Sequence, residues 1–259
     1  MNNFDHILWV FSSKAFLPSD IIGGIYPANF LKIKQLIFLS NHDPSKTLDI
    51  LKPKLIILGK CLNSNIINLT VEAKKRKIYI ISIFDDWHFE PQSSREKIKF
   101  NFNKELAFLA DTLIVKSEGA KKLIKKNLNI ESRIINDCVR YKSLEPRSKI
   151  SDEPKLLWFG TSSNHDTLIT AINEIIETNV YCSLSIVTNV TENIKNFIDD
   201  IKKDKIKIKI IEFSESNLIK EAELSEVIII PLFNDFKRLV KSSNRFVDAI
   251  NFGRFIITN

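Results

Sequence analysis

Acidic and imidazole side chains follow one of the most apolar runs in the chain. Asp85, Asp86 and His88 come directly after residues 78–84. At the carboxyl end of a strand, such groups could act as a base, stabilise charge or accept hydrogen bonds from sugar hydroxyls. One Asp could equally cap a helix. Because two adjacent carboxylates and one imidazole are a weak pattern for a metal site, we expect no bound metal.

A second group lies where the apolar residues 156–159 end. Gly160, Thr161 and Ser162 are small, and small residues let backbone N–H groups approach a phosphate beside a helix N-terminus. An ordinary strand-to-helix turn with a polar N-cap explains the same residues. The local chemistry leaves both interpretations open.

A third group is basic and polar and lies at the start of a predicted helix over residues 243–252. It consists of Arg238, Lys241, Ser242, Asn244 and Arg245. Cations are unfavourable at a helix N-terminus, where the dipole is already positive, so a bound phosphate would explain them. A solvated basic helix start is the alternative. Gly23 and Gly24, after the first strand, form no G-x-G-x-x-G or P-loop pattern and are a weaker candidate for a ligand loop.

Alternating strands and helices must position these residues. Apolar runs predict strands over residues 7–11, 36–39, 55–58, 78–84, 112–115, 133–135, 156–159, 184–187, 206–211, 227–230 and 255–258. Amphipathic segments predict helices over residues 64–77, 117–127, 166–178, 192–202, 215–224 and 243–252. The alternation is typical of βαβ units, and strands that are apolar throughout suit parallel sheets covered on both faces.

The alternation is interrupted once, over the polar residues 138–154. The sequence therefore predicts an α/β fold with two Rossmann-like, doubly wound domains in series. We expect an N-terminal domain over residues 1–140, a linker over 141–154 and a C-terminal domain over 155–259. Such sheets bind ligands beyond the carboxyl ends of their strands, so we expect the site in a cleft between the domains.

Composition excludes several classes of protein. The 259 residues are 44% hydrophobic and 27% charged, which is typical of a globular chain. No apolar run approaches the roughly 18 residues of a membrane span. The N-terminus has an acid where a signal peptide has its basic region, and three widely spaced cysteines form no C-x-x-C pair. We therefore expect a cytoplasmic protein, and a periplasmic binding protein is disfavoured.

Charge is uneven along the chain. Residues 1–150 carry a formal charge of +10 and residues 151–259 carry −3, within a total of +7. This asymmetry indicates an anionic partner for the N-terminal half, such as a membrane surface or a phosphorylated carrier. Solvated helix faces explain the lysine runs equally well. Because no aromatic residues are interleaved with them, we expect no nucleic acid partner.

Three segments resemble glycosyltransferases of the GT-B fold, of the family-4 type and the "glycosyltransferase family 1" proteins of bacterial polysaccharide clusters. ADTLIVKSEGAKKLI (residues 110–124) resembles the stretch that closes their N-terminal domain, and LLWFGTSSNHDTL (156–168) resembles the start of their donor domain. KSSNRFVDAINFGRFIITN (241–259) resembles their donor-site helix, with Asp248 in the place of an acidic residue.

The resemblance implies a hexosyltransferase that works without a metal or cofactor in polysaccharide biosynthesis. It would move a sugar from a nucleotide-diphosphate donor to a glycan or lipid-linked acceptor, at the inner face of the membrane. Asp248 would contact the ribose, and residues 241–245 would lie by the diphosphate. Asp85, Asp86 and His88 would face the sugar and the acceptor.

The chain also departs from the family. Val240 stands where the first Glu of the E-x7-E pair is expected, and the Arg and Lys that usually follow the donor domain's first strand are absent. Lys241, Arg245 or Arg238 would therefore neutralise the diphosphate. Because the chain stops straight after a strand, we expect a short or truncated member. Alternatives are a non-catalytic nucleotide-sugar-binding scaffold protein and a sugar-nucleotide epimerase of the same fold.

Overall fold

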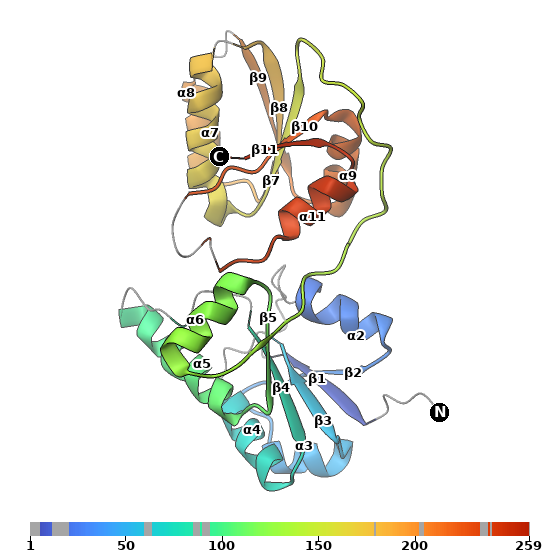
Figure 1. The fold of residues 1–259 in the computed structure, drawn as a ribbon, viewed down its shortest axis with the longest axis vertical. Coiled ribbons are helices and arrows are strands. Elements are labelled where there is room, and N and C mark those ends of the chain that lie inside the picture. Colours follow the sequence, from blue (N-terminus) through green and yellow to red (C-terminus); the bar gives the residue numbers. More distant parts are fainter. Residues whose placement is uncertain are drawn as a thin grey trace. The chain divides into compact units, whose positions relative to one another are not determined.

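The computed structural model describes residues 6–11, 21–59, 64–84, 89, 94–178, 180–201, 205–233, 238 and 240–258, with the backbone alone for 94–96 (Figure 1). The chain divides into two compact units. Unit 1 comprises Met1–Cys138 and Asp235–Ser243, and unit 2 comprises Val139–Asn234 and Asn244–Asn259.

Unit 1 is built on a six-stranded sheet in the order β2-β1-β3-β4-β5-β6, in which every pair is parallel. The strands are β1 (Ile7–Phe11), β2 (Lys34–Ile37), β3 (Leu55–Leu58), β4 (Tyr79–Phe84), β5 (Thr112–Val115) and β6 (Arg133–Ile134). Their connections contain η1 (Ile21–Ile25), α2 (Tyr26–Phe30), α3 (Pro44–Leu51), α4 (Asn65–Lys75), α5 (Ser94–Leu109) and α6 (Glu118–Leu128). The predicted α/β fold with parallel sheets is confirmed in this unit.

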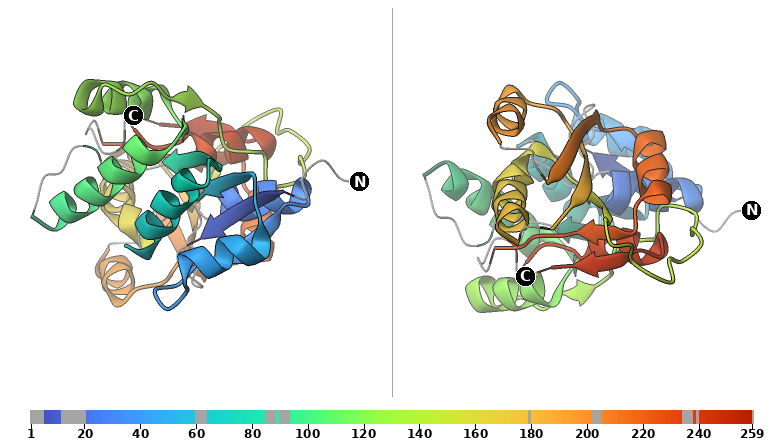
Figure 2. Two further views of the ribbon diagram at one scale, coloured as in Figure 1. Left: turned by 90° about the horizontal axis from the view of Figure 1, so that it is seen from below. Right: turned by 90° about the horizontal axis from the view of Figure 1, so that it is seen from above.

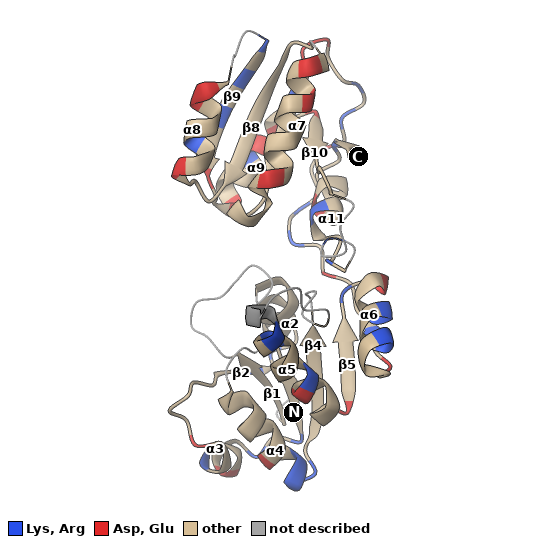
Figure 3. Cartoon of the chain, turned by 90° about the vertical axis from the view of Figure 1, so that its left-hand side faces the viewer, with Lys and Arg blue, Asp and Glu red and all other residues tan. Residues whose placement is uncertain are grey.

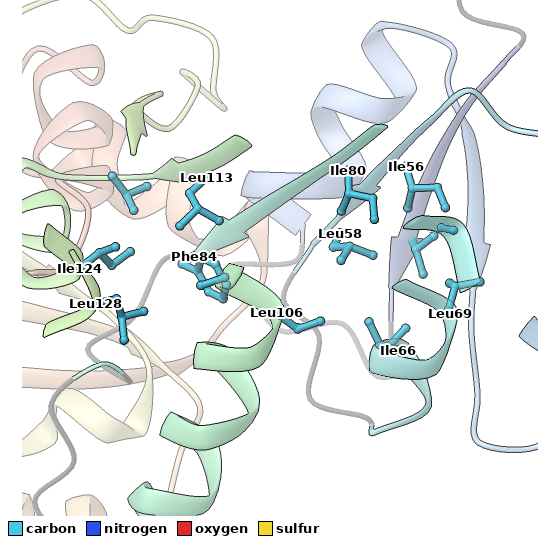
Figure 4. Close-up of a cluster of buried hydrophobic side chains, with 14 of the residues drawn as sticks. Ile56, Leu58, Ile66, Leu69, Ile80, Phe84, Leu106, Leu113, Ile124 and Leu128 are labelled. Carbon is cyan, nitrogen blue, oxygen red and sulfur yellow. The ribbon is translucent and has the colours of Figure 1, made fainter. Parts of the chain in front are cut away.

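Helices α4, α5 and α6 cover one face of this sheet (Figure 4). Strand residues such as Ile56, Ile80 and Leu113 meet helix residues such as Leu69 and Ile124 there. Burying each such aliphatic side chain contributes roughly 1.5–3 kcal/mol. The other face buries Trp9, Phe11 and Ile57 with Ala28 of α2. Both faces are therefore covered, which is why the central strands β1 and β3 are apolar at every position.

A late segment of the chain completes the unit 1 core. Val240 is 4% exposed and packs in the same cluster as the side chains of Figure 4. Ser117 caps α6 by accepting a hydrogen bond from the Ala120 amide at 3.1 Å, and its hydroxyl donates to the Val240 carbonyl at 2.7 Å. The hydroxyl thus joins the start of α6 to residue 240.

Unit 2 has a five-stranded sheet in the order β11-β10-β7-β8-β9, again with parallel pairs. The strands are β7 (Lys155–Phe159), β8 (Cys182–Thr188), β9 (Ile206–Glu212), β10 (Val227–Ile229) and β11 (Phe255–Ile257). The helices are η2 (Ser162–Asn164), α7 (His165–Thr178), α8 (Glu192–Asp200), α9 (Glu215–Leu224) and α11 (Asn244–Asn251). Figure 2 shows the same elements in two further views.

Alternate residues of β7 point to the two faces of this sheet. Trp158 packs in one cluster with residues of α7 and α8, and Leu157 and Phe159 pack in another with residues of α9 and α11. In Figure 1, α7 and α8 lie on one side of the sheet and α9 and α11 on the other. The second sheet is therefore also covered on both faces.

Residues after Val139, which include the predicted linker, pack on unit 2. Tyr141 stacks on Phe252 with ring centroids 5.3 Å apart, and the Asn251 side chain donates to the Tyr141 carbonyl at 2.6 Å. Gly253 has a φ of 60°, and a Cβ there would lie 2.6 Å from Pro146 Cα. The backbone conformation and this close approach both require glycine at 253.

Candidate functional site

A turn at Gly160 follows the carboxyl end of β7 and packs closely against Trp158. The Gly160 amide donates to the Val187 carbonyl at 3.2 Å, which continues the pairing with β8. A Cβ at Gly160 would lie 3.0 Å from ring atoms of Trp158 and 3.6 Å from Arg245 Nη1. The Arg245 guanidinium therefore lies next to the backbone beyond the strand.

The side chains after Gly160 hold the turn itself. Thr161 Oγ1 and Ser163 Oγ are 2.9 Å apart, and the Asn164 amide donates to Thr161 Oγ1 at 3.2 Å. Ser162 and Ser163 are exposed. The structure is compatible with both a phosphate-binding loop and an ordinary strand-to-helix turn. The polar side chains order the turn, and hydroxyl groups line its exposed face.

The first turn of α11 brings Arg245 to Gly160. Asn244 Oδ1 accepts a hydrogen bond from the Arg245 amide at 2.7 Å, and Arg245 Nη1 is buried. A guanidinium at this end of a helix adds charge to the positive end of the dipole, and an anion would relieve the repulsion. Gly160, Asn244 and Arg245 therefore form one positively charged corner of unit 2.

The other predicted donor residues have different positions. Lys241 and Ser242 belong to the segment that is grouped with unit 1, and so does Arg238, whose carbonyl accepts from the Lys241 amide at 3.2 Å. Lys241 is exposed, while Arg238 and Ser242 are half-buried. All three residues therefore belong to unit 1, whereas Gly160 and Arg245 belong to unit 2.

Asp248 is buried in an ion pair. It is 1% exposed, and the Arg140 guanidinium contacts both of its carboxylate oxygens, with Nε 3.3 Å from Oδ1 and Nη2 on Oδ2. Sequence reasoning missed Arg140, because 108 residues separate it from its partner. A basic residue at the edge of a polar connection gives no local sign of such a pair.

His165 lies beside the Gly160 turn, at the start of α7. Its Nε2 is 2.9 Å from Thr188 Oγ1, and its ring centroid is 6.0 Å from that of Trp158. Burial lowers the pKa of His165, and the neighbouring Asp166 carboxylate partly opposes this shift. These are the contacts of a neutral histidine that packs behind the turn.

In unit 1, Gly23 and Gly24 lie in the π-helical turn η1. A Cβ at Gly24 would lie 2.5 Å from Phe11 Cε1, and one at Gly23 would lie 3.7 Å from Lys116 Nζ. Lys116, directly after β5, is 6% exposed and pairs with Asp137 at 3.3 Å. The turn therefore packs against a buried cation that sequence reasoning missed, although a lysine directly after an apolar strand is a detectable signal.

Asp85, Asp86 and His88 lie outside the described residues. They follow β4, whose last residue is Phe84. Among the residues that the structure does describe, no group of three His, Cys, Asp or Glu side chains could hold a metal ion.

Charge is distributed differently over the helices of the two units. Lys122, Lys125 and Lys126 are exposed on α6, where Figure 3 shows a basic face, while acidic residues mark α7, α8 and α9. Lys125 pairs with Glu131 at 2.7 Å. No helix within the described part of the chain has the length and apolar character needed to cross a membrane.

The chain matches no family model and no curated protein. It does share its fold with solved GT-B glycosyltransferases. HepE of Anabaena, solved in complex with UDP and glucose, gives a TM-score of 0.66 at 10% identity, over 98% of this chain and 80% of that one. The lipopolysaccharide outer core galactosyltransferase WaaB gives 0.58 at 14% identity, over 97% and 80%. A glycosyltransferase from Rickettsia africae gives 0.60 at 13% identity, over 97% and 78%.

Proposed function

We propose that this chain is a GT-B glycosyltransferase of the hexosyltransferase type, which moves a sugar from a nucleoside-diphosphate donor to an acceptor. The observation that carries the proposal is the fold, which is shared over 97% or more of the chain with three solved glycosyltransferases. One of them was solved with UDP and glucose. The two doubly wound domains and the family-4-type assignment are part of the proposal.

The donor's diphosphate is proposed to bind at the corner formed by Gly160, Asn244 and Arg245. Three features support this position: the side-chain-free backbone at Gly160, the guanidinium 3.6 Å from the Cβ position there, and the N-terminus of α11. Thr161 and Ser162 would supply hydroxyls. Arg238, Lys241 and Ser242 are proposed as further donor contacts because they lie close to Arg245 in the sequence.

Transfer is proposed to depend on positioning and on charge stabilisation. As the bond between the sugar and the diphosphate breaks, negative charge accumulates on the leaving diphosphate. Fixed cations such as Arg245 stabilise that charge, so the proposal includes neither a metal nor a cofactor. Asp85, Asp86 and His88 are proposed to face the sugar and the acceptor, from the end of β4.

The acceptor is proposed to be a glycan or a lipid-linked saccharide of polysaccharide biosynthesis. The excess of positive charge in residues 1–150 and the basic face of α6 support an anionic acceptor or an anionic membrane surface (Figure 3). The protein would then work in the cytoplasm, peripherally at the inner face of the membrane. The Gly23–Gly24 turn, beside buried Lys116, is proposed as the N-terminal ligand loop.

One observation favours a non-catalytic nucleotide-sugar-binding protein as a second candidate. Val240 stands where the resemblance places a Glu, and it is buried in an apolar cluster. An apolar side chain there provides neither charge nor a hydrogen bond to a donor sugar. Such a protein would bind the nucleotide without breaking the sugar–phosphate bond.

Thermal unfolding of the full chain with nucleotides tests the donor site. The melting temperature is measured with UDP, GDP, ADP, CMP and dTDP, without metal and then with Mg²⁺. A nucleotide at a hundred times its Kd stabilises the native state by about 2.7 kcal/mol, so we expect a clear rise with one diphosphate. Arg245→Gln should abolish the rise.

The matched control is Arg133→Gln, which removes an exposed arginine on β6 and should preserve the rise. If no nucleotide raises the melting temperature of the wild-type chain, the donor-site proposal is wrong. Incubation with the corresponding nucleotide sugar then separates the two candidates, because only an enzyme releases the diphosphate by transfer or slow hydrolysis.

A further inference from the structure

We propose that the amino edge of the unit 1 sheet is a docking surface for an acidic segment of a partner protein. The amino edge is the end at which the parallel strands β2, β1, β3 and β4 begin. It carries exposed lysines at Lys32, Lys34, Lys52, Lys54, Lys74, Lys75 and Lys77. The proposal does not depend on the donor site, which is placed in unit 2.

The sheet brings these lysines to one line. Lys34 is the first residue of β2 and is aligned with Leu8 of β1. The Lys54 amide donates to the His6 carbonyl at 2.8 Å, and the Lys54 carbonyl accepts from the Tyr79 amide at 3.0 Å. Because neighbouring strands are about 4.8 Å apart, the edge from β2 to β4 is about 14 Å long. Figure 3 shows basic segments close to α3 and α4 at this end of unit 1.

Three of the lysines have a backbone conformation that disfavours lysine. Lys32, Lys52 and Lys77 have φ angles of 54°, 45° and 58°, and they lie at the ends of α2, α3 and α4. A side chain in this left-handed region meets a backbone carbonyl, so glycine or asparagine is usual there. The chain follows this preference after α6 and α11, where Asn129 and Gly253 have φ angles of 55° and 60°.

The helix dipole alone does not explain the three left-handed lysines. A cation near a helix C-terminus is favourable, but it can occupy the last turn without backbone strain. Lys125 and Lys126 do so in α6, and Lys74 and Lys75 do so in α4. Helix α4 therefore has two cations in its last turn before Lys77 is added. Strained conformations are retained where function needs them, and these three share a positive charge at one edge.

The positive charge of this edge is available to a partner. The described acids at the edge are paired with cations at the end of α4. The pairs are Asp49–Arg76, Glu72–Arg76, Glu72–Lys75 and Asp111–Lys74. In the part of the chain that the structure describes, no ion pair is formed by the side chains of Lys32, Lys34, Lys52, Lys54 and Lys77. The edge thus presents ammonium groups without internal counter-ions.

Exposed apolar side chains accompany two of the left-handed lysines. Phe30 is 86% exposed and Ile50 is 68% exposed, and each lies two residues before such a lysine. Aromatic or aliphatic side chains beside cations offer a protein both apolar contact and charge complementarity. An extended segment of about four or five residues has the length of the edge. Glutamates or aspartates with interspersed apolar residues would therefore fit it.

Fluorescence anisotropy with a labelled deca-glutamate peptide tests the surface on the full chain. The titration is made at about 0.15 M salt, where exposed charges more than roughly 8 Å apart are largely screened. The wild-type chain should bind the peptide. Changing Lys32, Lys52 and Lys77 together to Asn should raise the Kd about tenfold, because each exposed ion pair contributes up to a few-fold in affinity.

The same Asn variant separates a role in binding from a role in folding. Asparagine tolerates a positive φ better than lysine does, so the melting temperature of the variant should equal or exceed that of the wild-type chain. A clear fall would show that the three lysines serve the fold, and it would overturn the inference.

The matched control changes Lys122, Lys125 and Lys126, which are exposed on α6, to Gln. It has the same net charge as the Asn variant and should bind the peptide with a Kd within twofold of the wild-type value. An equal loss in the two variants would mean that net charge alone determines binding. That result, or a wild-type chain that does not bind the peptide, would contradict the inference.

Other polyanions identify the class of partner. The Asn variant should bind vesicles with anionic lipid, and a single-stranded DNA of ten thymidines, to the same extent as the wild-type chain. If the variant loses vesicle or DNA binding as strongly as peptide binding, the edge does not select a protein and the inference is wrong. Each of these outcomes leaves the donor-site proposal unchanged, because nucleotide titration tests it separately.

Discussion

Single residues in unit 2 combine packing with polar contacts close to the Gly160 turn. Trp158 is fully buried and touches the space where a Gly160 side chain would be, and His165 lies against Trp158 while contacting Thr188. The turn therefore rests on residues that are themselves fixed by the core. A change behind the turn should consequently lower the stability of unit 2.

His165 gives a prediction about pH. Burial holds its pKa below the usual 6.5, so the unfolded chain binds more protons than the native chain as the pH falls past that value. The stability that neutral His165 contributes is complete above pH 6.5 and is lost on acidification. We expect the melting temperature to fall between pH 7.5 and pH 5.5, a window above the range in which carboxylates titrate.

The measurement compares the wild-type chain with His165→Gln, which removes the titration but keeps a side chain that can bond to Thr188. The variant should lose less stability over the same pH interval. An equal loss in the two proteins would mean that His165 is not the group responsible.

At the scale of elements, the sequence predicts best those strands whose residues are all buried between two layers of helices. Residues 55–58 and 113–115 are apolar throughout because both faces of the sheet are covered, and the structure has strands over 55–58 and 112–115. β2 begins two residues before the predicted strand, at Lys34, because exposed residues at this edge carry no apolar signal.

Other elements could not be predicted from local patterns. Helix α5 was not predicted, because exposed Ile98 and Phe108 blur its apolar stripe. The Arg140–Asp248 pair depends on contacts 108 residues apart, which no local spacing reveals. The residue types of the Gly160–Arg245 corner are apparent in the sequence, but their approach depends on how α11 packs against the sheet that contains β7.

Alanine is expected to have opposite effects on stability at two glycine positions. Gly253→Ala places a Cβ at a φ of 60° and 2.6 Å from Pro146, so it should destabilise the chain by about 2 kcal/mol. Gly119 lies in the first turn of α6, where alanine is the better helix former, so Gly119→Ala should stabilise by about 0.5–1 kcal/mol. Urea unfolding measures both changes. Equal effects would contradict the backbone argument.

At the scale of the whole molecule, the two halves of the chain differ in net charge. The first 150 residues carry the positive charge, and the helices of unit 2 carry most of the visible acidic faces (Figure 3). This division is consistent with a first part of the chain that meets an anionic surface.

Vesicle binding tests the proposed role of the basic face. Replacing Lys121, Lys122, Lys125 and Lys126 of α6 by Gln should weaken binding to vesicles with anionic lipid at low salt by at least tenfold, since each basic residue near the surface contributes about 1 kcal/mol. Cosedimentation measures the bound fraction, and high salt should release the wild-type chain.

The control for net charge replaces four lysines near α3, α4 and the start of β3, namely Lys52, Lys54, Lys75 and Lys77, by Gln. This variant has the same net charge as the α6 variant and should bind like the wild-type chain. A wild-type chain that ignores anionic vesicles, or a control that weakens as much as the α6 variant, would contradict a role for this face.

The packing of Val240 has a consequence for how the protein is made. Unit 1 spans residues up to Cys138, yet one of its core side chains and the acceptor for the Ser117 hydroxyl belong to residue 240. During synthesis at about 5–20 residues per second, roughly 5–20 seconds pass between the two. During this interval the nascent first unit lacks one apolar side chain of its core and the acceptor for the Ser117 hydroxyl. Both are added only when most of the second unit has been translated.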